Sequence, residues 1–161
     1  MESNGWELFA HPLLLDQLDR LASAVERDKA KKPKEYRSSA NFKLLAALNE
    51  LLFVVIPADP TRPEFRQGTT LSGAYKHWFR AKFGAQRFRL FFRFDTRARV
   101  IIYAWVNDEH SKRTYGSRTD AYAVFKNMLE SGQPPDAWAE LLKASRTSAA
   151  VERFSKRRRG T

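Results

Sequence analysis

The chain has 161 residues, of which 43% are apolar, and this is enough for one folded domain with a hydrophobic core. Its net charge of +11 favours nucleic acid, an anionic membrane surface or an acidic protein as the partner. It contains no cysteine, which excludes disulfides, thiolate zinc sites and cysteine nucleophiles.

The charge does not come from the terminal basic run alone. Without the four cations of residues 156–159 the net charge is still +7, so the body of the chain is itself basic. We expect no apolar run to be long enough to cross a bilayer, and the first residues lack the apolar segment of a signal peptide. We therefore expect a cytoplasmic protein without a membrane partner.

The first half of the chain predicts one short strand and two helices. Residues 5–10 alternate between apolar and polar, which is typical of a strand. Apolar residues then recur every three or four positions from 14 to 25, and Pro12 suits the first turn of a helix there. A second helix is expected from about Ser38, a good N-cap residue, to Pro57. The two helices should form an antiparallel hairpin on one face of a sheet.

The second half predicts an antiparallel meander followed by further helices. After a long loop over 57–76, strands are expected at 78–83, 87–94 and 100–106, and the last, apolar on both faces, should be central. Helices are expected over 120–130 and 136–143. We expect 1–145 to form the folded domain and 146–161 to be a basic, disordered tail, because small and basic residues predominate there.

The stretch 87–94 is the most informative segment, because its alternation separates two different faces. One face is apolar and consists of Phe88, Leu90, Phe92 and Phe94. The other is cationic and consists of Arg87, Arg89, Phe91 and Arg93. A face that serves solubility alone normally mixes both signs of charge, so this one suggests an anionic ligand.

The neighbouring strand is predicted to extend the cationic face. Trp78, Arg80 and Lys82 share one face of it, and antiparallel pairing can place them beside the arginines. Together with the polar stretch 107–115, this predicts a concave basic patch that carries the rings of Trp78, Phe91 and Tyr115. Cations that hold phosphates beside rings that stack on bases suit single-stranded nucleic acid. The alternative is a solvated sheet face without a ligand.

Two further candidates are weaker. His77 could act as a general base, although a lone histidine beside a loop is more often incidental. The run Asp108-Glu109-His110 could suggest a metal ligand set, but the chain has three histidines and no second cluster of this kind. We therefore expect no metal site and no cofactor.

Several blocks along residues 4–142 follow one another in a distinctive order. They are 4–12 (NGWELFAHP), 65–68 (FRQG), 78–84 (WFRAKFG), 87–93 (RFRLFFR), 105–109 (WVNDE), 113–116 (RTYG), 119–122 (TDAY) and 124–125 (VF). In these blocks the chain resembles the YhaV toxins, a branch of the RelE/ParE superfamily.

The resemblance implies an α+β, RelE-like fold, with an antiparallel sheet, an N-terminal helical hairpin on one face and additional C-terminal helices. It also implies the toxin of a type II toxin–antitoxin system, an endoribonuclease that cleaves mRNA in association with the ribosome and inhibits translation and growth. The implied partner is a PrlF-type antitoxin of the AbrB kind. Matched to the superfamily motifs, Arg80, Lys82, Arg89, Arg113 and Tyr115 are the implied catalytic residues.

RNA cleavage without a metal needs a base for the ribose 2′-hydroxyl, an acid for the leaving oxygen and cations for the phosphorane charge. We expect Lys82 to be the base, because crowding by neighbouring arginines favours its neutral form. Arg80 would stabilise the transition state, Arg89 would clamp the phosphate or assist the leaving oxygen, and Tyr115 would stack on or orient a base. His77 is the alternative base. The expected RNA-binding residues are Trp78, Arg87, Phe91, Arg93 and His77.

Two other functions stay open. The superfamily includes ParE-like toxins that inhibit DNA gyrase by binding it, and the patch could also belong to an RNA-binding module without turnover. The dense set of arginine, lysine and tyrosine favours the nuclease, because a gyrase inhibitor does not need it.

Overall fold

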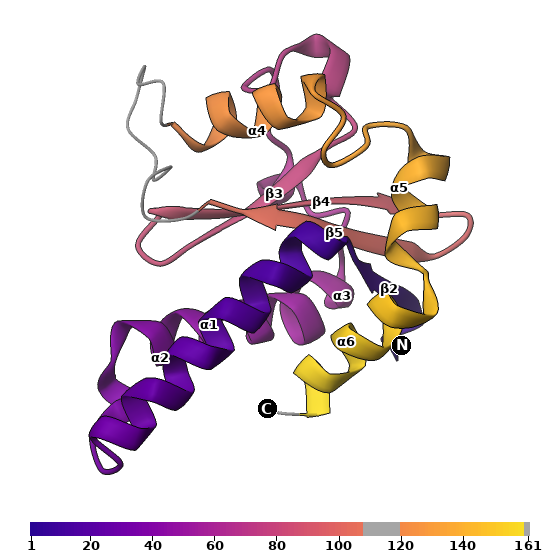
Figure 1. Ribbon diagram of the computed structural model, residues 1–161. Helices are drawn as coiled ribbons and strands as arrows, with labels where there is room; N and C mark the ends of the chain where they lie inside the picture. Colours follow the sequence, from indigo (N-terminus) through magenta and orange to yellow (C-terminus); the bar gives the residue numbers. More distant parts are fainter. Residues whose placement is uncertain (108–119, 160–161) are drawn as a thin grey trace.

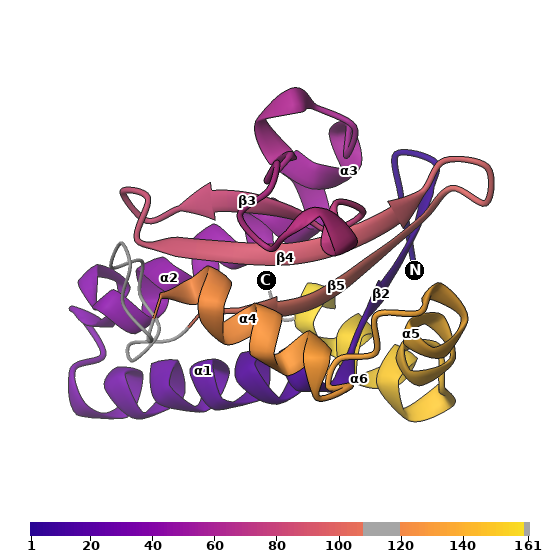
Figure 2. The same cartoon turned by 90° about the horizontal axis from the view of Figure 1, so that it is seen from above.

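A computed structural model of the chain describes residues 1–107 and 120–159 and shows an α+β fold around one five-stranded sheet (Figure 1). Helices cover both faces of this sheet, as the view from above also shows (Figure 2). The strands are, in spatial order, β1 (Glu2–Ser3), β2 (Trp6–Ala10), β5 (Val100–Val106), β4 (Phe88–Asp95) and β3 (Phe79–Phe83). The three predicted meander strands are confirmed, and β5 is central.

The sheet is mixed, so the expectation of a purely antiparallel sheet is wrong. β4 is antiparallel to both β3 and β5, but β2 runs parallel to β5, with Leu8 opposite Ile101. A long connection made of helices and loops separates β2 from β5, so no hairpin forces the two strands to run in opposite directions.

The predicted helical hairpin is confirmed. It consists of α1 (Pro12–Lys31) and a continuous helical rod formed by α2 (Ala40–Glu50), the π-helical segment η2 (Leu51–Val55) and α3 (Ile56–Ala58). Ser39, one residue later than expected, caps α2 by accepting a hydrogen bond from the amide of Phe42 at 3.1 Å. Leu14 and Leu18 of α1 and Leu52 of the rod are fully buried in a core against the sheet.

A second core lies on the opposite face of the sheet, under α4 (Ala121–Glu130) and α5 (Trp138–Ser145). Phe125 of α4 stacks on Phe91 of β4, with ring centroids 4.3 Å apart. A β-bulge at Ala104 shifts the register, so that Ala104 and Trp105 both face this core. Both faces of the sheet are therefore covered by helices.

The long loop before β3 contains two 3-10 turns, η3 (Pro63–Phe65) and η4 (Gly73–Tyr75), and a third turn, η1 (Tyr36–Ser38), joins α1 to α2. Gln67 organises this loop from a buried position. Its side-chain amide donates to the carbonyl of Tyr75 at 2.9 Å and accepts from the amide of Leu71 at 3.1 Å.

The predicted disordered tail is wrong, because residues Ser148–Arg159 form helix α6. Its residues Ala150 and Phe154 are 3% and 2% exposed and join the core under α1. The two positions are four residues apart, so they lie on one side of a helix. In the sequence this short apolar stripe is obscured by the basic residues around it.

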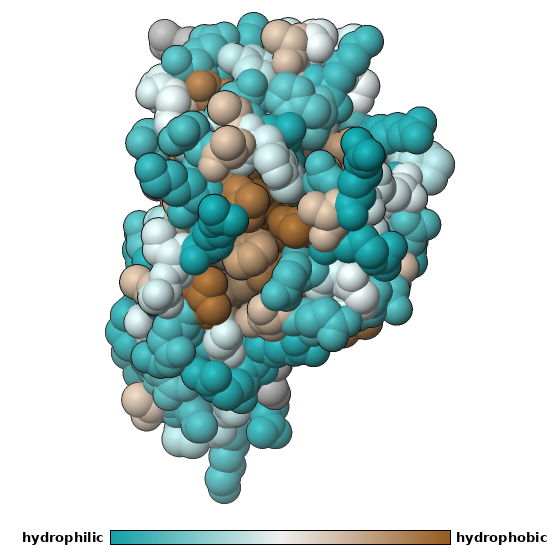
Figure 3. Space-filling view, turned by 90° about the vertical axis from the view of Figure 1, so that its right-hand side faces the viewer, coloured by the Kyte–Doolittle hydropathy of each residue, from teal (hydrophilic) through white to brown (hydrophobic). Residues whose placement is uncertain are grey.

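The helical rod Ala40–Ala58 is long and apolar enough to cross a membrane by length and composition, which the sequence-based expectation missed. Its most apolar window has a mean hydropathy of 1.5, and 33% of that window is buried. Core positions such as Leu48 and Ile56 account for part of this apolar character. The face of the molecule in Figure 3 is mostly hydrophilic, with apolar side chains gathered in a central hollow.

Candidate functional site

Two arginines on adjacent strands converge on one phenol oxygen. Arg80 of β3 and Arg89 of β4 both point to the α4 face of the sheet, because Ala81 and Leu90 occupy the opposite core. The Nε of Arg80 donates a hydrogen bond to the hydroxyl of Tyr122 at 2.8 Å, and the Nε of Arg89 donates to the same oxygen at 3.3 Å. We call these three residues the Arg80–Arg89–Tyr122 cluster.

The cluster is almost covered and has an unusual charge. Arg80, Arg89 and Tyr122 are 8%, 4% and 4% exposed. Within the described part of the chain, neither arginine forms an ion pair with a carboxylate, and their Nη1 atoms donate to the backbone carbonyls of Glu64 and Gln86. Two neighbouring cations held away from water without a carboxylate are unfavourable for stability. Such an arrangement indicates a functional site.

The arginines change the acidity of the tyrosine. Burial by itself would raise the pKa of Tyr122, but the hydrogen bonds from Arg80 and Arg89 and the charges of both lower the pKa below its ordinary value. Tyr122 also lies in the first turn of α4, where the helix dipole favours negative charge. A lowered pKa increases the fraction of Tyr122 that is present as phenolate, which is the form that can accept a proton as a general base.

Asn107, at the end of β5, holds the backbone that carries Arg89. Its side-chain carbonyl accepts from the amide of Arg89, and its side-chain Nδ2 donates to the carbonyl of Arg87 at 3.0 Å. The residue is 2% exposed, so these bonds are shielded from water. The side chain extends the ladder between β4 and β5 by one step and so positions Arg89.

Of the predicted residues Lys82 and Arg87, Lys82 lies at the exposed rim of the cluster, whereas the guanidinium of Arg87 contacts Phe88, a residue of the opposite core. Lys82 is the cross-strand partner of Arg89, which places it on the same face of the sheet. Both side chains are exposed, and the guanidinium of Arg87 lies 5.6 Å from the ring centroid of Phe88. The structure thus brings Arg80, Lys82 and Arg89 together, as the sequence predicts.

Other predicted site residues lie elsewhere. Trp78 and Phe91 are 0% exposed beneath α4, so the expectation that their rings stack on RNA bases is wrong. The period-two reading placed Phe91 on the correct face, but α4 covers that face. Arg113 and Tyr115, and the Asp108-Glu109-His110 run, lie outside the described residues.

Arg93 and His77 also lie apart from the cluster, around Asp136 between α4 and α5. Arg93 donates to the carbonyl of Asp136, and its guanidinium lies between the rings of Trp78 and Trp138, 5.8 and 5.2 Å from their centroids. His77 Nε2 lies 2.6 Å from a carboxylate oxygen of Asp136. These contacts fasten the α4–α5 connection to the sheet.

Tyr122 is the site residue that sequence reasoning missed. It belongs to the TDAY block, but nothing in the local pattern distinguishes it from an ordinary apolar position of an amphipathic helix. Its role depends on contacts with residues 33 and 42 positions away. In the described ranges no group of three or more histidine, aspartate or glutamate side chains is arranged to hold a metal ion.

A basic cluster with a proton-carrying group, on a small α+β domain, is the kind of site that a nuclease can use. Residues 8–146 match the family described as a toxin with endonuclease activity, of a toxin–antitoxin system, and the chain belongs to this family.

The family is that of the YhaV toxins. The chain is 48% identical over 139 residues to the ribonuclease toxin YhaV of Escherichia coli strain K12, an alignment that covers 86% of this chain and 90% of the relative. It is 46% identical over 146 residues to toxin YhaV of E. coli O6:H1, over 90% and 95% of the two chains. No solved structure matches the chain.

Proposed function

We propose that this toxin is a metal-independent endoribonuclease that cleaves mRNA at the Arg80–Arg89–Tyr122 cluster. The single observation that carries the proposal is the convergence of two guanidiniums, neither paired with a carboxylate in the described part of the chain, on one phenol oxygen. The name of the E. coli K12 relative, a ribonuclease toxin, supports RNA as the substrate. It also favours the nuclease over a gyrase inhibitor or a binding module without turnover.

In the proposed reaction the 2′-hydroxyl of the substrate attacks the adjacent phosphorus. The bond between O2′ and phosphorus forms and the bond from phosphorus to O5′ breaks, which yields a 2′,3′-cyclic phosphate and a 5′-hydroxyl. The phenolate of Tyr122 accepts the 2′ proton. The exposed ammonium group of Lys82 donates a proton to the leaving O5′, so the proton count balances.

The arginines stabilise the charge of the transition state. In the described part of the chain, the Nη2 groups of Arg80 and Arg89 take no part in hydrogen bonds, so they remain as donors to the phosphorane oxygens. The exposed Arg87 would bind a neighbouring phosphate of the strand. We assign the base role to Tyr122 rather than to Lys82, because the arginine pair lowers the pKa of Tyr122.

We further propose the cellular setting of this activity. The resemblance supports a RelE-like toxin that acts in the cytoplasm on mRNA at the ribosome and thereby inhibits translation and growth. As the family is that of a toxin–antitoxin system, an antitoxin partner is implied. We propose that this partner is of the PrlF type, of the AbrB kind.

The test is cleavage of RNA by purified protein in the presence of EDTA. Arg80→Ala should lower the cleavage rate by about 100-fold or more, since it removes one donor to the phosphorane. Arg97→Ala, which removes an exposed arginine in the β4–β5 turn, is the matched control and should cleave normally. Wild-type fragments should end in a 2′,3′-cyclic phosphate, and both variants should keep the far-UV circular dichroism of the wild type.

The proposal fails if Arg80→Ala still cleaves RNA and arrests growth. Intact RNA with retained binding by the wild type would support the binding module instead. Loss of wild-type cleavage on addition of EDTA would contradict a metal-independent mechanism.

A further inference from the structure

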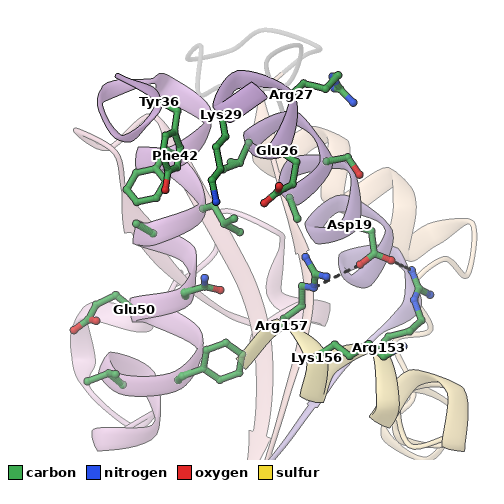
Figure 4. A pocket seen from close by; sticks show the side chains of 18 residues that line it. Asp19, Glu26, Arg27, Lys29, Tyr36, Phe42, Glu50, Arg153, Lys156 and Arg157 are labelled. Carbon is green, nitrogen blue, oxygen red and sulfur yellow. Dashed lines mark hydrogen bonds and ion pairs between the residues drawn. The ribbon is translucent and has the colours of Figure 1, made fainter. Parts of the chain in front are cut away.

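A groove lies between α1, α2 and α6, on the sheet face opposite to α4 (Figure 4). Its volume is about 1130 Å³, and its walls are formed by α1 residues between 19 and 29, rod residues between 42 and 54, and α6 residues between 153 and 157. Lys29 from one wall and Arg157 from another point toward its centre. The groove is larger than a typical small-molecule pocket, which suits a segment of a macromolecule.

Part of the lining of the groove is apolar and open to solvent. Leu45, Phe53 and Val54 contribute to it, and Val54 is 54% exposed. Among the large apolar residues of the described ranges, Val54 is the one with an exposed side chain. It belongs to the rod Ala40–Ala58, of whose most apolar window only 33% is buried. An apolar surface inside a polar rim is typical of a protein-binding site.

Within the described ranges, two buried polar atoms of the groove residues make no hydrogen bond. Across the described part of the chain, three buried side-chain atoms have no hydrogen bond, and two of them, Asn49 Oδ1 and Arg157 Nε, belong to groove residues. The Arg157 Nε lies 3.8 Å from Asp19, too far for a hydrogen bond. Buried polar groups normally have partners. Both atoms are shielded from solvent, so a bound segment could reach them only after these side chains move.

The charge of the α6 wall indicates the sign of the partner. Arg153 is already neutralised by Asp16 and Asp19, at 2.7 and 2.8 Å. Lys156 is exposed and has no ion pair within the described ranges, and the helix ends in further arginines. An acidic side chain at the edge of the bound segment would complement this wall. RNA is less suitable here, because the carboxylates of Glu26 and Glu50 stand on the other walls.

We propose that the groove between α1, α2 and α6 binds an amphipathic, acidic-edged segment of the antitoxin. This inference rests on the antitoxin partner of the proposed function. The segment places its apolar side over Val54 and Phe53 and its acidic side against Lys156. Because the groove and the Arg80–Arg89–Tyr122 cluster lie on opposite faces of the sheet, antitoxin affinity and RNA cleavage are separable by mutation.

The experiment compares Val54→Asp, Lys156→Glu and their combination with the wild type in the full-length chain. Lys143→Glu makes the same charge change at an exposed position of α5 outside the groove and is the matched control. The affinity of each protein for a purified PrlF-type antitoxin is measured by titration calorimetry, beside RNA cleavage and circular dichroism. We expect each groove variant to bind about tenfold more weakly and the double variant more weakly still. Cleavage should stay within about twofold of the wild type, and Lys143→Glu should bind normally.

Wild-type affinity in both groove variants would overturn the proposal, and so would an equal loss in Lys143→Glu. Loss of RNA binding or cleavage in the groove variants would identify the groove as an RNA surface instead. A change in the oligomeric state of the toxin alone would identify a contact between copies. If the wild type does not bind the PrlF-type antitoxin at all, the proposed partner is wrong, and with it the proposed ligand of the groove. If all the proteins bind the antitoxin equally, the partner is right but the groove is not its binding site.

Discussion

At the scale of single residues, the fold lowers the pKa of Tyr122 by bringing Arg80 and Arg89 to its hydroxyl group. A tyrosine in an apolar environment normally resists ionisation, and burial pushes the pKa of Tyr122 in that direction. The two arginine Nε donors reverse this tendency, because both hydrogen bonds strengthen when the oxygen is negative. The arginines therefore have two roles in the proposed site: they prepare the base and they stabilise the phosphorane.

This assignment predicts the pH profile of cleavage. If the phenolate of Tyr122 is the base, the rate should rise with pH until the pKa of Tyr122, which lies below 10.0, is reached. Tyr122→Phe should remove this rise and lower the rate by about 100-fold or more. The check is the cleavage rate between about pH 5 and 10, with Tyr75→Phe as the control. An unchanged profile in Tyr122→Phe would assign the base role to another group, with Lys82 the first to test.

At the scale of elements, the start of α1 depends on a buried histidine. Nδ1 of His11 accepts a hydrogen bond from the amide of Leu13 at 3.1 Å, so the side chain caps the helix. His11 is 4% exposed. Burial lowers its pKa from 6.5 to about 4, and the nearby charge of Asp16 opposes this effect in part. Only the neutral imidazole can accept the capping bond, so the cap requires the unprotonated form.

The cap predicts how stability depends on pH. Because the folded pKa of His11 is about 4 and the unfolded value is 6.5, the unfolded chain binds more protons between these values. The contribution of His11 is therefore complete above about pH 6.5 and is lost as pH falls toward 4, by up to about 3 kcal/mol. His11→Asn keeps a capping side chain that does not titrate, so its free energy of unfolding should fall less over this range.

The measurement is urea unfolding of wild type and His11→Asn at several pH values between 4 and 7. His77→Asn, at a partly exposed histidine, should retain the pH dependence of the wild type. Parallel curves for wild type and His11→Asn would show that the histidine is not buried in its neutral form.

At the scale of the whole molecule, α6 joins the end of the chain to its beginning. Phe154 lies 5.2 Å from Phe53 and 6.1 Å from Tyr103 between ring centroids, so it fills the core between the rod and β5. Arg153 binds α1 through Asp16 and Asp19. Arg158 donates to the carbonyl of Glu2 at 2.8 Å. The last helix is thus part of the domain.

Phe154→Ala should destabilise the protein by about 3–5 kcal/mol, because it removes a buried ring and leaves a cavity. Arg159→Ala, at an exposed position of the same helix, should change stability by no more than about 0.5 kcal/mol. Chemical denaturation of both variants checks this. A disordered tail would make the two substitutions equally harmless, which would contradict the packing of α6.

The local order of this protein was predictable from its sequence: the meander of β3, β4 and β5, the central place of β5 in the sheet, the helical hairpin, the two faces of residues 87–94 and the neighbourhood of Arg80, Lys82 and Arg89. These follow from side-chain periodicity and short turns, which act over a few residues. The tertiary structure was needed to show that β2 is parallel to β5, that α6 is folded, that α4 buries Trp78 and Phe91, and that Tyr122 contacts the arginines. Periodicity predicts the face of a strand or helix from which a side chain projects. Which other element covers that face depends on packing between segments far apart in the chain.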